Sequence, residues 1–584
     1  MSGEVLVGED RPPRRHPRVL TSSCLRSRVR SAYSCSVSTP QNPAARTAVT
    51  GVLPILAAAQ FLMTLDSSVM NVSISQVAAD VHTTVSGVQT AITMFTLVMA
   101  SLMITGGKIG ALLGRRNAFM LGLVIYGIGS LVTGVASSLP VLLIGWSLLE
   151  GIGAALIMPA IVALVAGNFP PARRSSAYGM VAAAGAIAVA IGPLLGGAVT
   201  TFASWRFVFF GEVVIVLIIL GLSRRLADTP RSGAKPFDLV GALLSIIGLS
   251  LVVFGVLRSG EWGWIAHREG TPALLGMSPV LWMLLGGLGT LGGFLAHEAR
   301  RVERHREPLV QPSLLRNTKV VGGLLMFFFQ YLSQAGVFFT IPLFLSVVLE
   351  MSALATGLRL LPLSAALLLS AIFVPRLFPA ASPRRVVRIG LLLMIAATVI
   401  LIAGVSPDAG AEIVAIPMLL MGFGIGSLAS QLSAVTVSAV PESMSEEVGG
   451  LQNTALNLGA SLGTALAGAV LIASLTTGVA SGISTDPRIS AEVKATATTK
   501  LIGQVPFVSN SQLDHALADA GISPSDAAAI KAVNTKARSD ALDESLGVIA
   551  LLEVVALGFS TMIRRRPLSE EEPSTSLEAT GPTS

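Results

Sequence analysis

The chain has 584 residues, of which 52% are hydrophobic and only 12% are charged. A soluble domain carries about 25% charged residues, so this composition excludes an ordinary soluble protein and indicates that lipid is the main solvent. The formal net charge of +7 does not indicate nucleic acid as a partner, because the arginines stand in short strings between apolar stretches.

The first 47 residues form a polar tail rich in arginine and serine. The tail lacks the continuous apolar segment of a secretory signal, so we expect residues 1–47 to be a disordered cytoplasmic extension. The two cysteines of the chain, Cys24 and Cys35, both lie here. Two cysteines alone build neither a disulfide framework nor a zinc site, and we expect no metal site and no cofactor.

Apolar runs of about 20 residues, each long enough to cross a bilayer as a helix, follow the tail and recur to the end of the chain. The sequence predicts fourteen of them, at 51–73, 88–107, 117–137, 140–167, 177–201, 206–223, 238–258, 279–297, 320–346, 356–376, 387–405, 412–437, 448–473 and 545–563. The chain is therefore expected to be an all-α protein embedded in the lipid bilayer.

Pairs of arginines follow the second, fourth, sixth, eighth and tenth runs, and Arg564-Arg565-Arg566 follows the last. Basic loops are retained on the cytoplasmic side of a membrane. The pattern therefore predicts a multi-pass protein of the cell (inner) membrane with its N- and C-termini in the cytoplasm.

A polar to amphipathic segment, 474–544, separates the last two runs and is predicted to lie outside the membrane. Within it, Ser523-Pro524-Ser525-Asp526 is typical of a helix start, with a capping serine, a proline in the first turn and an acid at the third position. An amphipathic helix over 527–542 could follow. A small external cap and a flexible loop are both compatible with this segment.

The fifth run carries small residues at every fourth position, which allows a second helix to approach closely: Ala184, Ala188, Gly192 and Gly196. A proline within it removes a backbone hydrogen bond and favours a bend. The whole spacing resembles the antiporter motif of the major facilitator superfamily, G-x6-G-P-x2-G-G, at Gly185, Gly192, Pro193, Gly196 and Gly197.

Further strings resemble the fourteen-helix drug:proton antiporter branch of that superfamily, and the similarity runs from about residue 51 to 475. They are Leu65–Val72 (L-D-x-T-V-x-N-V), Trp205-Arg206 with Phe209 (W-R-x-x-F), Gly357–Pro362 (G-L-R-x-L-P) and Gly450–Thr454 continuing through Gly459 and Gly463. The resemblance implies two six-helix bundles, at 48–226 and 301–563, joined by a linker at 227–300 with two inserted helices. A cytoplasmic tail at 564–584 would complete the chain.

The resemblance also implies a secondary transporter that exports small amphipathic or lipophilic compounds by alternating access, in exchange for protons and as a monomer. Two departures from the branch bear on this mechanism. The loop after the second run keeps Gly107, Gly114, Arg115 and Arg116, but the family's acid is Ala111 and the following arginine is Leu112. In the fourth run, the family's arginine and glutamine are replaced by Ser147 and Glu150.

Ionisable residues inside membrane spans are functional candidates because they are costly to bury there. Asp66 is the leading candidate for proton or cation coupling, and Glu150 and Glu212 are candidates to assist it. Each has a structural alternative: hydroxyl groups beside Asp66 could hold it in place, Glu150 could face a wet cavity, and Glu212 could lie near the outer surface. Glu553, in the last run, is a weaker candidate of the same kind.

A second group of residues is predicted to line the substrate path. Glutamines and asparagines recur four residues apart, with aromatic residues and one arginine nearby, at Phe327, Gln330, Tyr331, Gln334, Arg359, Asn453 and Asn457. Helix–helix hydrogen bonding, aromatic packing and snorkelling of the arginine account for the same residues equally well.

No enzymatic constellation is legible in the chain. Gly459–Gly463 matches the G-x-S-x-G string of hydrolases, but it lies in an apolar helix with no preceding strand, and no nucleotide-binding loop is present. Three alternatives to proton-driven drug export remain open. These are an exporter that is uncoupled or dedicated to a native metabolite or lipid, a degenerate transporter that acts as a sensor or scaffold through 474–544, and, last, a membrane-embedded enzyme.

Overall fold

The computed structural model describes residues 43–169, 171–224, 226, 237–268, 271–378, 380–406, 409–440, 444–494, 507–563 and 565. The chain divides into two units, 1–46 and 47–584, and the helical body is the second. Most of the two predicted tails, with both cysteines, lies outside the described residues.

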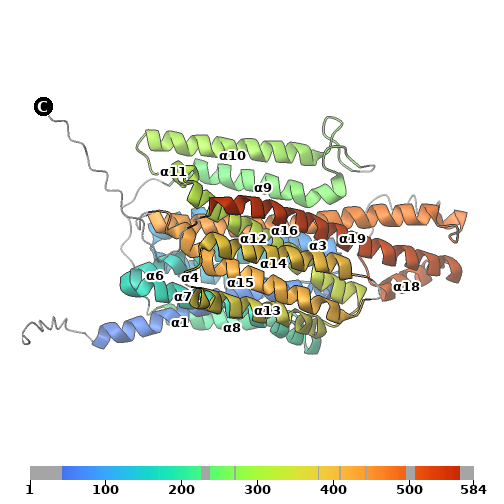
Figure 1. Cartoon of the computed structure of the whole chain (residues 1–584), viewed down its shortest axis with the longest axis horizontal. Helices are drawn as coiled ribbons and strands as arrows, with labels where there is room; N and C mark the ends of the chain where they lie inside the picture. The colour runs from blue at the N-terminus through green and yellow to red at the C-terminus, as the bar shows by residue number, and fades with distance from the viewer. Residues whose placement is uncertain are drawn as a thin grey trace, which may run out of the picture. The chain divides into compact units, whose positions relative to one another are not determined.

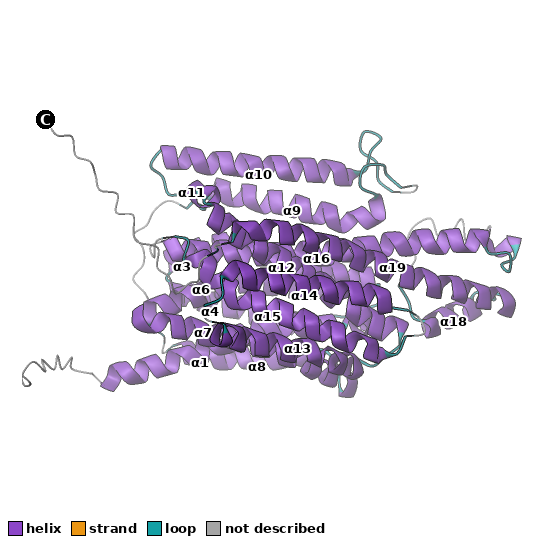
Figure 2. Ribbon diagram, in the orientation of Figure 1, coloured by secondary structure: helices purple, strands orange, loops and turns teal. Residues whose placement is uncertain are grey.

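The described part of the chain is built of helices and loops without a strand (Figure 2). Within the described ranges, thirteen helices are long and apolar enough to cross a membrane, and a bent pair, Ala177–Val189 and Ile191–Phe202, makes a fourteenth. Helices dominate because a backbone in lipid must satisfy its hydrogen bonds within its own segment. The predicted fold class is confirmed.

The first bundle contains six spanning helices and two short helices. The spanning helices are α1 (Pro43–Val72), α3 (Val85–Leu113), α4 (Arg115–Gly134), η1 (Leu143–Glu150) continued by α6 (Gly151–Asn168), α7 (Pro171–Phe202) and α8 (Arg206–Ser223). The short helices are α2 (Ile74–Asp80) and α5 (Leu139–Leu142).

The second bundle has the same number of spanning helices. They are α12 (Thr318–Leu343) continued by η2 (Phe344–Val348), α13 (Ala353–Leu377), α14 (Pro383–Gly404), α15 (Ala415–Val437), α16 (Ser445–Thr485) and α19 (Pro524–Phe559). The two inserted helices are α9 (Leu239–Trp262) and α10 (Pro279–Glu303), and α11 (Pro312–Arg316) connects them to the second bundle.

The bundles meet along two pairs of helices, α7 with α13 and α3 with α16. The inserted helices α9 and α10 lie side by side, and α9 packs against both α3 and α16 (Figure 1). The approach is close, because a Cβ atom added at Gly260 of α9 would lie 2.5 Å from the carbonyl oxygen of Ala469 on α16. The inserted pair therefore covers one of the two seams between the bundles.

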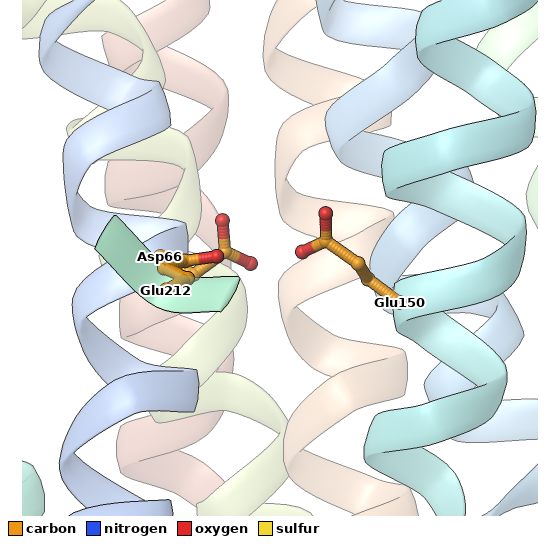
Figure 3. A group of neighbouring side chains, drawn as sticks. All are labelled: Asp66, Glu150 and Glu212. Carbon is orange, nitrogen blue, oxygen red and sulfur yellow. The ribbon is translucent and has the colours of Figure 1, made fainter. Parts of the chain in front are cut away.

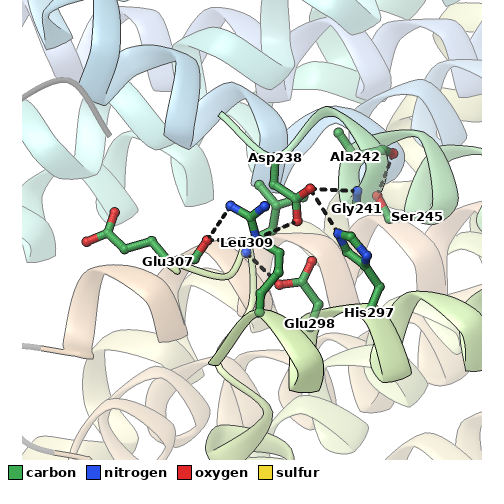
Figure 4. A network of polar contacts seen from close by, with 9 residues as sticks. Asp238, Gly241, Ala242, Ser245, His297, Glu298, Glu307 and Leu309 are labelled. Carbon is green, nitrogen blue, oxygen red and sulfur yellow. Dashed lines mark hydrogen bonds and ion pairs between the residues drawn. The ribbon is translucent and has the colours of Figure 1, made fainter. Parts of the chain in front are cut away.

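A polar network fixes the end of the inserted pair (Figure 4). Asp238 caps α9 by accepting a hydrogen bond from the Gly241 amide at 3.0 Å, and its carboxylate also meets His297 at 3.1 Å and Arg301 at 3.2 Å. Beside it, fully buried Glu298 accepts from the Leu309 amide at 2.7 Å. Partial burial opposes the charge on Asp238, but the Gly241 amide, His297 and Arg301 outweigh it and hold the pKa of Asp238 below its usual value.

Replacing Asp238 by alanine is expected to destabilise the inserted pair by about 1–3 kcal/mol, because it leaves buried donors without an acceptor. Asp238→Asn is the matched control, since asparagine also caps helices and loses only the ion pair. Because the folded pKa is depressed, the contribution of Asp238 is present above its unfolded value of about 3.9 and is lost as the pH falls through the folded value. Thermal unfolding in detergent measures both variants, and an alanine variant as stable as the native chain would contradict this role.

The segment between the last two spans is mainly helical where it is described, with short turns between its helices. The prediction of a helix start at Ser523 is confirmed, because its side chain accepts from the Asp526 amide and Pro524 opens α19. The last two helices extend beyond the predicted spans 448–473 and 545–563. α16 continues to Thr485, and α19 runs without interruption from Pro524 to Phe559, so the amphipathic helix and the last span are one element. Each is longer than a bilayer requires, because the polar residues beyond the apolar run keep helical hydrogen bonding.

The projecting ends of α16 and α19 pack on each other, and the short helix α18 (Asn510–Asp519) packs on α19. Val533 of α19 contacts the position of Gly482, where a side chain would clash. Arg538 is completely buried and donates to the Val508 carbonyl oxygen at 2.7 Å and to Asn510 Oδ1 at 2.6 Å. The described residues of this segment therefore form a packed helical unit, and its position outside the membrane stays a prediction.

Candidate functional site

Three carboxylic acids from three different helices meet inside the first bundle (Figure 3). Asp66 lies on α1, Glu150 at the end of η1 and Glu212 on α8. Their exposed fractions are 0%, 0% and 1%. One oxygen from each lies within 4.8 Å of one from each of the others. The structure thus brings together the three acids that the sequence singled out, and we call them the acid cluster.

Neighbouring side chains donate hydrogen bonds to the acid cluster. Trp146 Nε1 lies 2.9 Å from both carboxylate oxygens of Asp66. Thr133 Oγ1 donates to Glu150 Oε1 at 3.0 Å, while Ser130 Oγ and the Tyr126 hydroxyl approach Glu212 Oε2 at 3.1 and 3.5 Å. Sequence reasoning missed these donors. Three of the donors lie on one face of α4, at positions 126, 130 and 133, and this row of polar residues is the sequence pattern that could have revealed them. Trp146 lies on η1.

The acid cluster has more carboxylate oxygens than the surrounding described donors satisfy. Glu150 Oε2 and Glu212 Oε1 are buried without a hydrogen-bond partner in the described part of the chain. The ion pairs among the described residues join no lysine, arginine or histidine to any of the three acids. Buried charges that repel at this distance must bind protons or another cation, because isolated carboxylates are very costly away from water.

The backbone of the fourth span positions two members of the site. Leu143–Glu150 is a π-helix, a form that occurs frequently at functional sites. Trp146 is completely enclosed there and stacks on Phe95 of α3, with ring centroids 4.9 Å apart. A Cβ atom at Gly129 of α4 would lie 2.6 Å from Glu150 Cγ, so only glycine lets α4 approach this closely.

The residue at the family's arginine position serves helix packing in this structure. Ser147 is buried and donates to the Ala91 carbonyl oxygen of α3 at 2.8 Å. The loop between α3 and α4 turns at Gly114, whose φ of +94° is a conformation that favours glycine. Arg115 then donates to the Ala163 carbonyl oxygen at 3.3 Å, and Arg116 follows in the same helix. A Cβ atom added at Gly107 would lie 3.6 Å from Pro159 Cβ, which is an ordinary van der Waals contact.

The antiporter motif of α7 lies against α1 on one side and α13 on the other. An added Cβ atom would clash with Ser68 at Gly192 and with Val69 at Gly196, whereas Gly185 has ordinary contacts with Gln60. At Gly197, it would clash with the backbone of Ala353 at the start of α13. The motif therefore brings three helices into backbone contact.

Pro193 has a specific consequence for the contact between the bundles. Proline has no N–H, so the Val189 carbonyl oxygen four residues earlier loses its helical partner. In this structure that oxygen accepts a hydrogen bond from Ser364 of α13 at 3.2 Å. The helix bends by 41° beside Val189, as the proline predicted. A Cβ atom at Gly357 of α13 would in turn clash with the Pro193 carbonyl oxygen.

The string that opens the sixth span anchors the far end of the first bundle. Trp205 Nε1 and Arg206 Nη1 both donate to Asp80 Oδ2, at 2.9 and 3.0 Å. Arg206 Nη2 also donates to the Ala136 carbonyl oxygen at 2.7 Å. Asp80 is a partner that the sequence did not identify.

The residues predicted to line the substrate path lie on three helices of the second bundle. Phe327, Gln330, Tyr331 and Gln334 are on α12, Arg359 is on α13, and Asn453 and Asn457 are on α16. α12 and α16 pack directly on each other at Gly459 and Gly463, the two glycines of the string that matches G-x-S-x-G. Both asparagine amides donate to carbonyl oxygens of their own helix, at 3.0 and 2.9 Å, and not to another helix. Gln330 is 2% exposed and its Oε1 has no partner among the described residues.

Glu553 is a buried carboxylic acid outside the acid cluster. It lies on α19 with 1% exposed area. Ser333 of α12 donates to it at 2.7 Å, and Thr398 of α14 approaches both of its oxygens at 3.2 and 3.0 Å. Glu553 therefore joins three helices of the second bundle through hydroxyl groups.

Comparison with known proteins gives one family. The model of the Major Facilitator Superfamily matches residues 56–464. A puromycin resistance protein of Streptomyces alboniger is 30% identical over 415 residues, which cover 70% of this chain and 79% of the relative. A tetracenomycin C resistance and export protein of Streptomyces glaucescens is 27% identical, over 68% of this chain and 72% of the relative.

Two further matches complete the comparison. A cephamycin export protein of Amycolatopsis lactamdurans is 33% identical over 54% of this chain, which spans 62% of that relative. Among solved structures, an inward-facing bacterial homologue of the human lysosomal transporter Spinster superposes with a TM-score of 0.55 at 14% identity, covering 91% of this chain and 100% of the other. This last likeness concerns the fold alone.

Proposed function

This chain belongs to the major facilitator superfamily, and on that premise we propose that it exports small amphipathic or lipophilic compounds in exchange for protons. Relatives that match about seven tenths of the chain are named for resistance to puromycin and for resistance to and export of tetracenomycin C. The export of drug-like compounds is therefore the activity that these relatives favour for this chain.

The proton coupling rests on one observation, the acid cluster. Three buried carboxylic acids that have no ion pair with a cationic side chain of the described residues exchange protons readily, because each ionisation changes the cost of the next. In this proposal, the acid cluster takes up protons when it opens to the outer side and releases them to the cytoplasm. Trp146 holds Asp66 in position throughout, since it donates to both oxygens.

The contacts between the bundles suggest which side is closed. The predicted topology puts the end of α7 and the start of α13 and of α3 on the outer side. Backbone contact between Gly197 and Ala353, and donation by Gln89 of α3 to the Thr464 carbonyl oxygen at 3.0 Å, lie in those outer halves. We infer that this is an inward-facing state, from which a monomer with both termini in the cytoplasm rocks to expose its midplane site outward.

The substrate is proposed to bind between the bundles, against α12 and α16. Gln330 has a buried carbonyl oxygen without a partner among the described residues, and we propose that it faces the substrate together with the aromatic rings of Phe327 and Tyr331. An apolar site with few polar groups suits lipophilic compounds of varied structure. Arg359, Gln334, Asn453 and Asn457 are further candidates along the same path.

Substrate-induced proton movement in proteoliposomes tests this function. The panel includes lipophilic cations, neutral drugs and lipids, added under an imposed pH gradient to liposomes with and without protein. A compound that moves protons only in liposomes with protein, and is itself transported, supports coupled export. Transport without proton movement would replace the proposal by uncoupled export, and absence of transport by folded protein would contradict it.

A further inference from the structure

Two carboxylate oxygens of the acid cluster lack hydrogen-bond partners among the described residues, which indicates that the cluster binds a ligand other than a proton. Glu150 Oε2 and Glu212 Oε1 are buried and have no hydrogen-bond partner among the residues that the structure describes, although hydroxyl donors reach the opposite oxygen of each side chain. Figure 3 shows the Glu150 carboxylate directed across a gap toward Asp66 and Glu212. The described residues therefore supply no hydrogen-bond donor to either of these two oxygens. A cation placed between the three side chains would contact all of them.

The size of the gap and the chemistry of its walls select the kind of cation. One oxygen of each acid lies within 4.8 Å of the others, so an ion at their centre would lie at most about 2.8 Å from each, close to the 2.3–2.6 Å of Ca²⁺–oxygen bonds. The three acids offer only carboxylate oxygen as a ligand, which suits hard cations and not soft transition metals. Mg²⁺ binds at about 2.0–2.1 Å and keeps several of its waters, which a fully buried site does not favour.

We propose that Asp66, Glu150 and Glu212 form a binding site for a hard inorganic cation of the size of Ca²⁺ or Na⁺, which competes with protons for the same oxygens. The spacing of the acids in the sequence did not suggest a metal site, because they come from three separate helices. This inference goes beyond the proposed export, since it concerns binding to the resting protein and holds whether or not the chain moves drugs.

Competition with protons follows from the ligand chemistry. A carboxylic acid must lose its proton before it coordinates a metal, so cation binding releases protons and strengthens as the pH rises. The titratable groups that face the site are Asp66 on α1, Glu150 on η1, Glu212 on α8 and Tyr126 on α4. Ser130 and Thr133 are neutral, and each hydroxyl can rotate to offer a lone pair to the cation.

Fluorescence of Trp146 provides a direct readout, because its indole donates to Asp66 and stacks on Phe95. The purified full chain in detergent is titrated with CaCl₂ and NaCl, and with MgCl₂ and choline chloride as controls at matched ionic strength. We expect a saturable change with Ca²⁺ or Na⁺, a parallel rise in Tm, and an apparent affinity that increases about tenfold per pH unit for each proton displaced. Trp146→Phe should remove the optical signal and keep the rise in Tm.

Isosteric variants locate the site. Glu150→Gln and Glu212→Gln should each weaken cation binding at least about tenfold, a loss of about 1.4 kcal/mol. Glu553→Gln is the control, because it removes a buried acid of the other bundle. The proposal is overturned if no cation gives a saturable signal in folded protein, if only pH moves the signal, or if both glutamine variants bind as the native chain does. Because binding and transport are measured separately, failure of this site and failure of export are distinguishable.

Discussion

Replacing Asp66 by asparagine is expected to abolish substrate-induced proton movement, to the level of protein-free liposomes. Asparagine has nearly the same shape but cannot ionise, so the acid cluster loses the member that lies on the first span. Its amide group would also face the Trp146 indole N–H, which now reaches both Asp66 oxygens at 2.9 Å. One donor would meet another, at a cost of about 1–3 kcal/mol in stability.

Glu553→Gln is again the matched control for Asp66→Asn, since both remove a fully enclosed carboxylate in a membrane span. The native chain and both variants are compared by transport, by proton flux and by thermal unfolding in detergent. The coupling role predicts that only Asp66→Asn loses proton flux while both variants remain folded. Equal flux in Asp66→Asn and in the native chain would remove Asp66 from the mechanism.

Gly357→Ala is expected to reduce transport by about tenfold or more. The new methyl group would clash with the Pro193 carbonyl oxygen, at less than the 3.0 Å that real Cβ atoms keep. Both sides of this contact are backbone, so no side chain can move aside and α13 must separate from α7. Overpacking of this kind costs about 1–3 kcal/mol. It destabilises the conformation in which α7 and α13 are in contact.

Gly179→Ala, on α7, separates this effect from a general effect of glycine replacement. An added Cβ atom has no neighbour within 4 Å at Gly179, so transport should be unchanged or slightly better. Cysteines at Thr201 and Leu354, where the Leu354 amide donates to Thr201 Oγ1 at 3.0 Å, report whether the seam still closes. Gly357→Ala should slow their cross-linking and Gly179→Ala should not. Fast cross-linking and full transport in Gly357→Ala would show that this contact is dispensable.

The membrane architecture could be predicted from sequence because its causes are local. An apolar run of sufficient length must be helical in lipid, whatever its neighbours are. The same holds for the start of α19 at Ser523 and Pro524, and for the bend caused by Pro193. The continuation of α16 to Thr485, and of the helix that starts at Pro524 into the last span, was missed, because these polar extensions remain helical by packing on each other outside the apolar run.

The sequence by itself determined that Asp66, Glu150 and Glu212 are costly residues in apolar spans, and therefore candidates for function. Only the tertiary structure decided that they meet. Their distance depends on how α1, η1 and α8 are rotated and how closely they approach, which glycines such as Gly129 and Gly192 set through contacts with other helices. Hydrophobicity and charge along a chain are properties of each segment, whereas a site shared by three helices is a property of their packing.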